Sequence, residues 1–279
     1  MILVTGATGK VGRHLVEGLL AGGEAVRALT RDPAAAKLPP AAELAHFVPE
    51  QPETMSRALV GIDAVFINAT AVGAQITGLM TAAASAGVDR AVLLSSFTVR
   101  DDGAQPYSIG AHHQALEAAV AASPLDWAYL RCGGFAANTL AWAPGIRAEG
   151  VVRAPYLEAA TAPIAERDIA AAAVTVLLGD GHSGARYVLT GPQSLTQTDQ
   201  AHAIGAAIGR NLRIEELPPE VFRRAASAHM APAAVDDMLR YLASCVGRTA
   251  EMSPDLEKLT GRAGTTFAEW AHQRAASFR

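Results

Sequence analysis

Cysteine and aromatic residues are scarce in this chain of 279 residues. Its two cysteines, Cys132 and Cys245, lie far apart and form no C-x-x-C pair. We therefore expect neither a disulfide framework nor a cysteine-based metal site, and the composition suits a reducing compartment. Aromatic residues make up only 5% of a chain that is 50% hydrophobic, so alanine supplies much of the apolar content. Alanine favours helices and lets them pack closely against a sheet.

Strong charge of one sign and long apolar runs are also absent. The formal net charge is −4, with no broad basic field, so a nucleic-acid partner is not expected. No apolar run is long enough to span a bilayer, and the N-terminus has no basic stretch followed by an apolar one. The eight histidines show no metal-ligand spacing such as H-E-x-x-H. We expect a soluble, cytoplasmic protein without a metal and without a membrane partner.

Short apolar runs alternate with helical patterns over the first part of the chain. These runs are continuously apolar, which is typical of parallel strands that are covered on both faces. Helix patterns separate them, and one at Asp32-Pro33 has an N-cap residue followed by proline. The expected strands comprise residues 2–5, 25–29, 46–48, 64–67, 91–94 and 127–130. The sequence predicts an α/β fold, a doubly wound parallel-sheet Rossmann fold.

The pattern changes after about Gly133, where glycine and proline become frequent. We expect a Rossmann domain over residues 1–132, to which later segments around 151–192 return. Short strands are expected at 151–153 and 186–189, with a helix at 168–178. Residues 193–279 are predicted to form a smaller, mainly helical substrate-binding lobe, with helices at 196–208, 219–228 and 235–246. Open α/β sheets bind ligands at the carboxyl ends of their strands, and this lobe would cover them.

A glycine-rich segment follows the first expected strand. It reads Thr5-Gly6-Ala7-Thr8-Gly9-Lys10-Val11-Gly12, a G-x-x-G-x-x-G spacing at the start of a helix. Glycine allows the tight turn and the close approach of a pyrophosphate, which the helix N-terminus then stabilises. We predict that Gly6, Ala7, Thr8, Gly9, Lys10, Val11 and Gly12 bind a dinucleotide. The alternative is a structural turn without nucleotide.

The end of the second strand favours NADP (NADPH) over NAD. An acidic residue there binds the ribose hydroxyls of NAD, whereas arginine accommodates the 2′-phosphate of NADP. Arg31 falls at this position, and Asp32 is better explained as the cap before Pro33. An exposed arginine without a ligand is the alternative.

These residues resemble the NmrA-like family, an atypical branch of the short-chain dehydrogenase/reductase superfamily. Each segment is a modest signal, and their order along the chain makes them a strong one. The matching segments are residues 5–12, 27–33, 93–96, 113–117, 127–138, 167–170, 189–192 and 266–270. The resemblance implies a Rossmann domain with a small C-terminal lobe and a cleft between them. It also implies either an NADPH-dependent reductase of quinones and related conjugated substrates or an NADP-binding regulator.

The sequence lacks the Tyr-x-x-x-Lys pair of standard short-chain dehydrogenases. The chain has three lysines, and the residues four positions before them are Gly6, Pro33 and Pro254. Tyr107 falls in the expected region, but Ala111 stands where the lysine belongs. The usual alcohol/ketone mechanism, in which lysine lowers the pKa of tyrosine, is therefore not expected. Cys132 stands where family members often carry proline, either near the nicotinamide or as an apolar filler.

His113 is the candidate proton donor. It matches a His-x-x-x-Glu position of the family, and Glu117, one turn later, is expected to hydrogen-bond and orient its imidazole. The alternative is a helix-surface histidine that takes no part in proton transfer.

Other polar and glycine positions at the ends of the expected strands are candidates for cofactor contact. Ser95 and Ser96 end the fifth strand, where they face substrate or nicotinamide or only satisfy the strand end. Asn68, Ala69 and Thr70 end the fourth strand on the adenosine side. Gly133 and Phe135 follow the sixth strand. We assign Asn68, Ala69, Thr70, Ser95, Gly133 and Phe135 to the cofactor site, and Phe97, Phe135 and Trp142 to the apolar wall of the cleft.

The leading hypothesis is an NAD(P)H-dependent oxidoreductase that reduces a quinone, an enone or a similar conjugated small molecule by hydride transfer. A conjugated acceptor needs less help from a general acid, which fits the missing tyrosine–lysine pair. The alternatives are a non-catalytic NADP(H) redox sensor and a non-redox cyclase or isomerase. The sequence leaves open whether the protein is a monomer or a homodimer.

Overall fold

The central sheet is parallel throughout, as the apolar runs predict. The computed structural model describes residues 1–48 and 51–279. Seven strands lie in the order β3-β2-β1-β4-β5-β6-β9, and the first six follow the order of a dinucleotide-binding Rossmann fold. The strands are β1 (Ile2–Val4), β2 (Val26–Thr30), β3 (Glu43–His46), β4 (Ala64–Asn68), β5 (Arg90–Ser96), β6 (Asp126–Cys132) and β9 (Ala185–Leu189).

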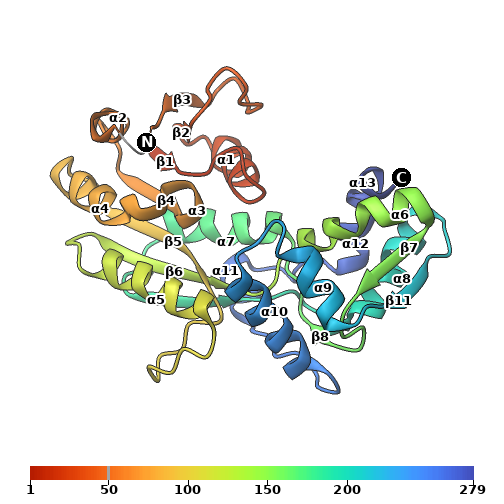
Figure 1. Ribbon diagram of the computed structural model, residues 1–279. Helices are drawn as coiled ribbons and strands as arrows, with labels where there is room; N and C mark the ends of the chain where they lie inside the picture. Colours follow the sequence, from red (N-terminus) through yellow and green to blue (C-terminus); the bar gives the residue numbers. More distant parts are fainter. Residues whose placement is uncertain (49–50) are drawn as a thin grey trace.

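Helices cover both faces of this sheet (Figure 1). One face packs against α1 (Gly12–Ala21), α7 (Glu166–Leu178) and α11 (Asp255–Thr260). The other packs against α2 (Pro52–Ala58), α4 (Ile76–Ser85) and α5 (Ser108–Ala121). Successive strand residues point to opposite faces, so Val4 lies in the first core and Leu3 in the second. The inner strands β1, β4, β5 and β6 are therefore buried on both sides, which explains why they are largely apolar, whereas the edge strands β3 and β9 are more exposed.

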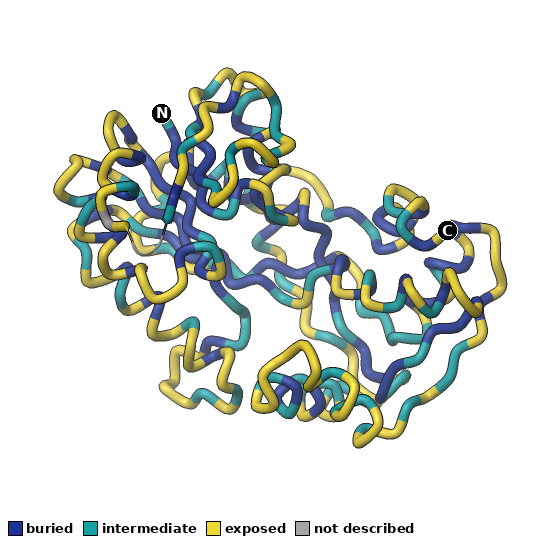
Figure 2. Tube along the Cα trace, turned by 45° about the horizontal axis from the view of Figure 1, so that its top comes forward, coloured by how far each residue is buried: buried dark blue, intermediate teal, exposed yellow. Residues whose placement is uncertain are grey.

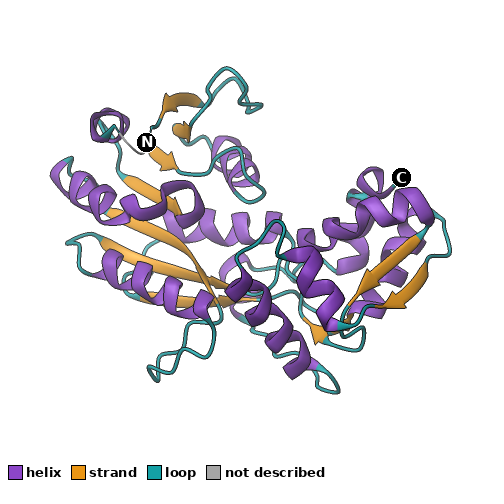
Figure 3. Cartoon of the chain, in the orientation of Figure 1, coloured by secondary structure: helices purple, strands orange, loops and turns teal. Residues whose placement is uncertain are grey.

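The remaining elements form a second, smaller unit beside the sheet (Figure 3). Its core consists largely of alanine and isoleucine side chains, closed by Phe267, Trp270 and Phe278. The trace in Figure 2 shows buried backbone running through both units. The lobe elements are η2 (Ala136–Trp142), α6 (Ala143–Glu149), β7 (Val151–Ala154), β8 (Ala160–Thr161), β10 (Leu195–Thr196), α8 (Gln197–Ile208), β11 (Arg213–Glu216), α9 (Pro219–Ala226), α10 (Pro232–Cys245), α12 (Phe267–Gln273) and α13 (Ala275–Phe278).

The predicted Rossmann class is confirmed, with three local differences. The strand at 151–153 does not return to the main sheet, because β7 pairs with β11 in the lobe, whereas α7 and β9 do return. No helix follows Asp32-Pro33: the carboxylate of Asp32 instead accepts hydrogen bonds from the backbone of Ala34 and Ala35 and holds a turn. The third strand comprises Glu43–His46 and shares only His46 with the expected strand at 46–48.

The short α3 (Ala69–Val72) and η1 (Gly73–Gln75) connect β4 to α4. Over residues 1–48 and 51–279, no helix is both long and apolar enough to cross a membrane.

Buried carboxylates at the start of α7 join the lobe to the sheet. Glu166 accepts hydrogen bonds from the backbone of Ala137 at 2.8 Å and from the indole of Trp270 at 3.0 Å. Asp168 accepts from the backbone of Thr265 and from the guanidinium of Arg262. Buried carboxylates are tolerated only when they are partnered in this way, so the two acids fix where the C-terminal helices dock.

Candidate functional site

The glycine loop forms a cradle that side chains would block. Gly6 has a φ of +63°, which L-residues with side chains rarely adopt, and its carbonyl accepts from the amide of Gly9 at 2.9 Å. A Cβ on Gly12 would lie 2.1 Å from the carbonyl oxygen of Gly6. Beneath the loop, Ala7 and Val11 are buried in the core and anchor it. The first turn of α1 has no side-chain cap. The amides of Arg13 and Leu15 donate to the carbonyls of Gly9 and Val11, which leaves the other N–H groups of this turn for a phosphate.

A cavity of about 380 Å³ opens beside this loop, at the carboxyl ends of β1, β2 and β4. Arg31 lies at the end of β2 in its lining and, among the described residues, its guanidinium has no hydrogen-bond or ion-pair partner. The carboxylate of Asp32 accepts from the backbone of its own turn, where the sequence predicted a helix cap. The lining consists of Gly6, Thr8, Gly9, Leu29, Thr30, Arg31, Asp32, Ala35, Ala36, Phe47, Asn68, Thr70 and Ala71.

Polar contacts fix the floor of this cavity. The hydroxyl of Thr5, buried at the end of β1, accepts from the amide of Asn68 at 2.7 Å. The side-chain oxygen of Asn68 accepts from the amide of Thr70 at 3.1 Å. Asn68 and Thr70 therefore line the cavity, whereas Ala69 is buried behind them. Lys10, exposed on the glycine loop, reaches the carbonyl of Ala137 in the lobe at 3.4 Å.

A second cavity, of about 190 Å³, lies further along the same edge of the sheet, past the ends of β5, β6 and β9. Phe97, predicted for the cleft wall, and Gly133, predicted for the cofactor site, both line it, and Tyr241 from α10 meets the ring of Phe97 edge-on at 5.7 Å. Phe135 packs on the sheet core and Trp142 on the lobe core, and neither lines this cavity. The lining consists of Phe97, Gly133, Gly134, Ala160, Ala162, Thr190, Tyr241, Ser244, Cys245, Arg248, Thr249, Ala250 and Glu251.

Glu117 does not orient His113, which corrects the expectation from the sequence. Its buried carboxylate accepts from the hydroxyl of Ser95 at 2.6 Å and from the guanidinium of Arg131 at 2.8 and 3.0 Å. Arg131 also donates twice to Asp101, in the loop after β5. The reason is charge: a buried carboxylate is stabilised more by an arginine fork than by a neutral imidazole. Ser95 is therefore part of this network, and its hydroxyl does not face the cleft as a free donor.

His113 lies half-buried on α5 and lines none of the cavities described here. Burial lowers the pKa of its imidazole to about 4, so the ring is neutral near neutral pH. Its Nδ1 is buried and has no hydrogen-bond partner among the described residues. A neutral ring is a poor proton donor, so a role for His113 in catalysis stays a prediction that mutation must test.

The lowered pKa of His113 predicts how the free energy of unfolding depends on pH. Its pKa is about 4 when folded and 6.5 when unfolded, so the unfolded chain binds the extra proton and stability falls as pH decreases from 6.5 to 4. We expect His113→Gln to remove about 1–3 kcal/mol of this acid destabilisation, measured by urea unfolding across that range. His202→Gln, on an exposed position of α8, should keep the wild-type slope. Equal slopes in wild type and His113→Gln would contradict the assignment.

Cys132 is an apolar filler. Its side chain is buried in the sheet core, and burial raises the pKa of the thiol well above its usual range. A thiol held protonated in this way is not a nucleophile.

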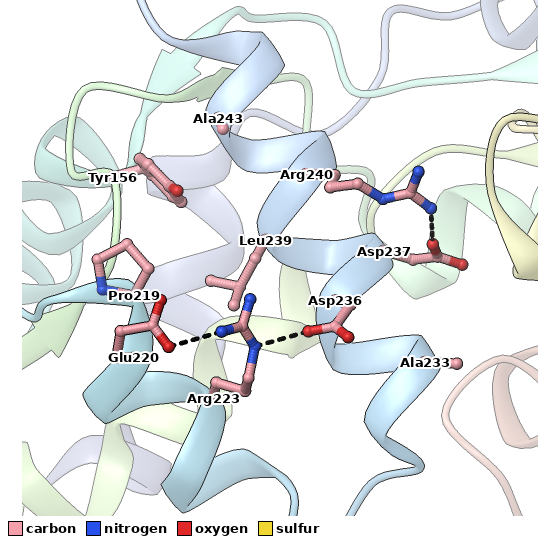
Figure 4. Close-up of a pocket in the computed structure, with 10 residues that line it drawn as sticks. All are labelled: Tyr156, Pro219, Glu220, Arg223, Ala233, Asp236, Asp237, Leu239, Arg240 and Ala243. Carbon is pink, nitrogen blue, oxygen red and sulfur yellow. Dashed lines mark hydrogen bonds and ion pairs between the residues drawn. The ribbon is translucent and has the colours of Figure 1, made fainter.

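A third cavity, of about 650 Å³, lies within the lobe between α9 and α10 (Figure 4). Its charged side chains bind one another: Arg223 donates to Glu220 and to Asp236, each at 2.6 Å, and Arg240 pairs with Asp237. Tyr156, from the loop after β7, lines the same cavity with a φ of +55°.

Helix α10 belongs to the lobe that the sequence predicted to cover the strand ends, but none of its side chains was singled out as part of the site. The buried carboxylate of Asp237 on this helix accepts from the amide of Ser108 at 2.5 Å and from the Ser108 hydroxyl, and so caps the N-terminus of α5, which has no side-chain cap of its own. Tyr241 on the same helix contacts Phe97 and Tyr107. These contacts bring α10 to the end of β5, although about 130 residues of sequence separate the two segments. No local motif signals such a distant contact.

Comparison with known proteins identifies the family. Residues 6–180 match the family model described as NAD(P)H-binding. The chain is 37% identical, over its whole length and 99% of the relative, to a (4-alkanoyl-5-oxo-2,5-dihydrofuran-3-yl)methyl phosphate reductase of Streptomyces griseus. It is 33% identical to an NAD(P)H azoreductase of Xenophilus azovorans, again over the whole chain and 99% of the relative.

A solved structure agrees with the sequence matches. An NADPH-dependent quinone oxidoreductase of Escherichia coli, complexed with NADPH, superposes with a TM-score of 0.79 at 26% identity, over 98% of this chain and 99% of that one. The chain therefore belongs to the NAD(P)H-binding family, within the NmrA-like group that its motifs resemble, and is an NAD(P)H-dependent oxidoreductase.

Proposed function

We propose that this oxidoreductase uses NADPH to reduce a conjugated small molecule, such as a quinone, an enone or an azo compound. The observation that carries the proposal is the pair of cavities along one edge of the sheet. The first combines the glycine loop with the unpartnered Arg31, and the second has an aromatic wall of Phe97 and Tyr241. The neighbouring order of β1, β4, β5 and β6 places them side by side along the path that a dinucleotide takes across such a sheet.

The residues of the first cavity fit NADPH. Gly6, Gly9 and Gly12 leave room where Cβ atoms would meet the loop itself or Asn68, so a pyrophosphate can approach the N–H groups of α1. Arg31 is free to bind the 2′-phosphate through its guanidinium fork. When bound, NADPH supplies a hydride, and the acceptor takes up that hydride and a proton. The chain's own residues bind and orient the two partners.

The named relatives support a conjugated acceptor. They are a furanone phosphate reductase, an azoreductase and a quinone oxidoreductase, and each name describes an acceptor with conjugated double bonds. In such acceptors the negative charge that hydride addition creates is delocalised, so a strong general acid is not required. This agrees with the absence of a Tyr-x-x-x-Lys pair and with the neutral imidazole of His113.

The proposal predicts NADPH consumption when a panel of quinones, enones and azo dyes is added to the purified protein without oxygen. We expect turnover with NADPH that exceeds turnover with NADH. Arg31→Ala should weaken NADPH binding roughly 10- to 100-fold and leave NADH binding nearly unchanged, because the lost contact is to the 2′-phosphate. His113→Ala tests the candidate acid in the same assay. Tight NADPH binding without consumption by any acceptor would overturn the proposal in favour of a redox sensor.

A further inference from the structure

The second cavity contains a cation without a partner. Arg248 lies in the loop after α10 and lines the cavity together with Phe97, Tyr241 and the hydroxyl-bearing Thr249. Over the part of the chain that the structure describes, its guanidinium makes no hydrogen bond and no ion pair. It is also the cavity's single positively charged lining residue.

Three other arginines of the lobe are paired with carboxylates, unlike Arg248. Arg223 and Arg240, which line the cavity between α9 and α10, are both paired with carboxylates (Figure 4). Arg153, beside them in the lobe, is paired with Glu149 and Glu215. The guanidinium of Arg248, which is an exposed residue, has all of its donors available for an anion.

One carboxylate, that of Glu251, lines the same cavity three residues after Arg248. The two groups do not form an ion pair in the described structure, so Glu251 does not neutralise the arginine. Instead, the charge of Glu251 acts on Arg100, whose pKa it helps to raise together with the stronger effect of Asp102. The lining of the cavity thus combines the unpaired guanidinium of Arg248 with the aromatic rings of Phe97 and Tyr241.

We propose that Arg248 binds an anionic oxygen group on the substrate, so that the preferred acceptors are planar conjugated molecules that carry a negatively charged substituent. The proposal rests on the function proposed above and names its substrate class. A guanidinium fork binds carboxylate, phosphate and sulfonate oxygens in the same geometry, and the strength of each bond grows as water is excluded from the cavity. The conjugated part of the molecule would pack against Phe97 and Tyr241.

The test compares two quinones, an anionic naphthoquinone sulfonate and the uncharged methyl naphthoquinone. The first measurement is the Kd of each quinone for the protein saturated with NADP⁺, by calorimetry, because no reduction occurs in that state. The second is kcat/KM for each quinone with NADPH. We expect Arg248→Ala to weaken binding and kcat/KM of the sulfonate roughly 10- to 100-fold, with little change for the uncharged quinone. For each quinone, the value of the variant is divided by that of the wild type, so the difference in intrinsic reactivity between the two quinones cancels.

Three further variants separate a charge effect from a structural one. Arg248→Lys should recover part of the affinity for the sulfonate, because it keeps the charge without the fork. Glu251→Gln should change sulfonate binding in the opposite direction, by removing a repulsive charge. Arg224→Ala removes an exposed arginine of α9 that lines none of these cavities and should change neither quinone.

Two results would overturn the proposal. One is an equal loss for both quinones in Arg248→Ala, which would indicate a structural role. The other is a weaker Kd for NADPH with unchanged sulfonate binding, which would assign Arg248 to the cofactor. The binding measurement does not depend on turnover, so a failure of the function proposed above would be recognised separately.

Discussion

Gly12→Ala is expected to weaken NADPH binding by at least about 100-fold, the largest effect that we predict for a single methyl group. The added Cβ would lie 2.1 Å from the carbonyl oxygen of Gly6 and 2.8 Å from the Cα of Ala7. Both are backbone atoms, so no side-chain rotation relieves the clash, and the loop must move away from α1. The N–H groups that we propose as the pyrophosphate site would then lose their common direction. Fluorescence titration with NADPH measures the loss.

Two other glycines make this prediction specific. A Cβ on Gly9 would lie 3.0 Å from the carbonyl of Gly6, so Gly9→Ala should have an intermediate effect. Gly78, on α4, would place its Cβ 3.8 Å from the side chain of Gln75, and Gly78→Ala should bind NADPH normally with equal or higher stability. If Gly12→Ala fails to fold, Gly9→Ala still tests the prediction, because it should bind NADPH more weakly than Gly78→Ala does. A folded Gly12→Ala protein with wild-type affinity would show that the loop does not hold the cofactor.

Arg131→Met is expected to lower the free energy of unfolding by about 3–5 kcal/mol. The Arg131 and Glu117 side chains are only 6% and 7% exposed, and the arginine supplies the countercharge for the carboxylate. Methionine fills a similar volume but leaves Glu117 with Ser95 as its remaining side-chain donor. The cost arises from a buried charge without its partner rather than from the lost bonds alone. Chemical denaturation of the purified variant measures it.

A matched surface pair and a double variant serve as controls. Arg153→Met also breaks two ion pairs, but its side chain is 36% exposed and solvent screens the charges, so we expect a much smaller loss than for Arg131→Met. Replacing Glu117 with Gln in the Arg131→Met background removes the uncompensated charge and should restore part of the stability. Similar losses in Arg131→Met and Arg153→Met would refute the role that we assign to the buried pair. Because Arg131 also holds Asp101, the variant should in addition loosen the loop that follows Phe97.

Local sequence determined the cofactor half of the protein. A continuously apolar strand, a glycine loop and an uncapped helix follow one another within about twenty residues, and each depends on short-range geometry that the sequence specifies directly. The same holds for Asp32, whose hydrogen-bond partners are only two and three positions away. The helix expected after Asp32-Pro33 was wrong for a related reason: the cap residue is satisfied equally well by a turn, so its presence does not require a helix.

Only the tertiary structure decided which distant side chains meet around Glu117 and in the second cavity. Glu117 lies one helical turn from His113, and the sequence paired them, but the fold brings Arg131 and Ser95 from two adjacent strands to the same carboxylate. Helix α10 reaches the end of β5 through Asp237 and Tyr241, and Arg248 enters the second cavity with it. Contacts between segments so distant in the chain depend on how the lobe packs, and no periodicity or spacing encodes them. The sequence by itself therefore determined that the protein binds a dinucleotide, and only the packing of the lobe decided which side chains line the second cavity, where we propose that the acceptor binds.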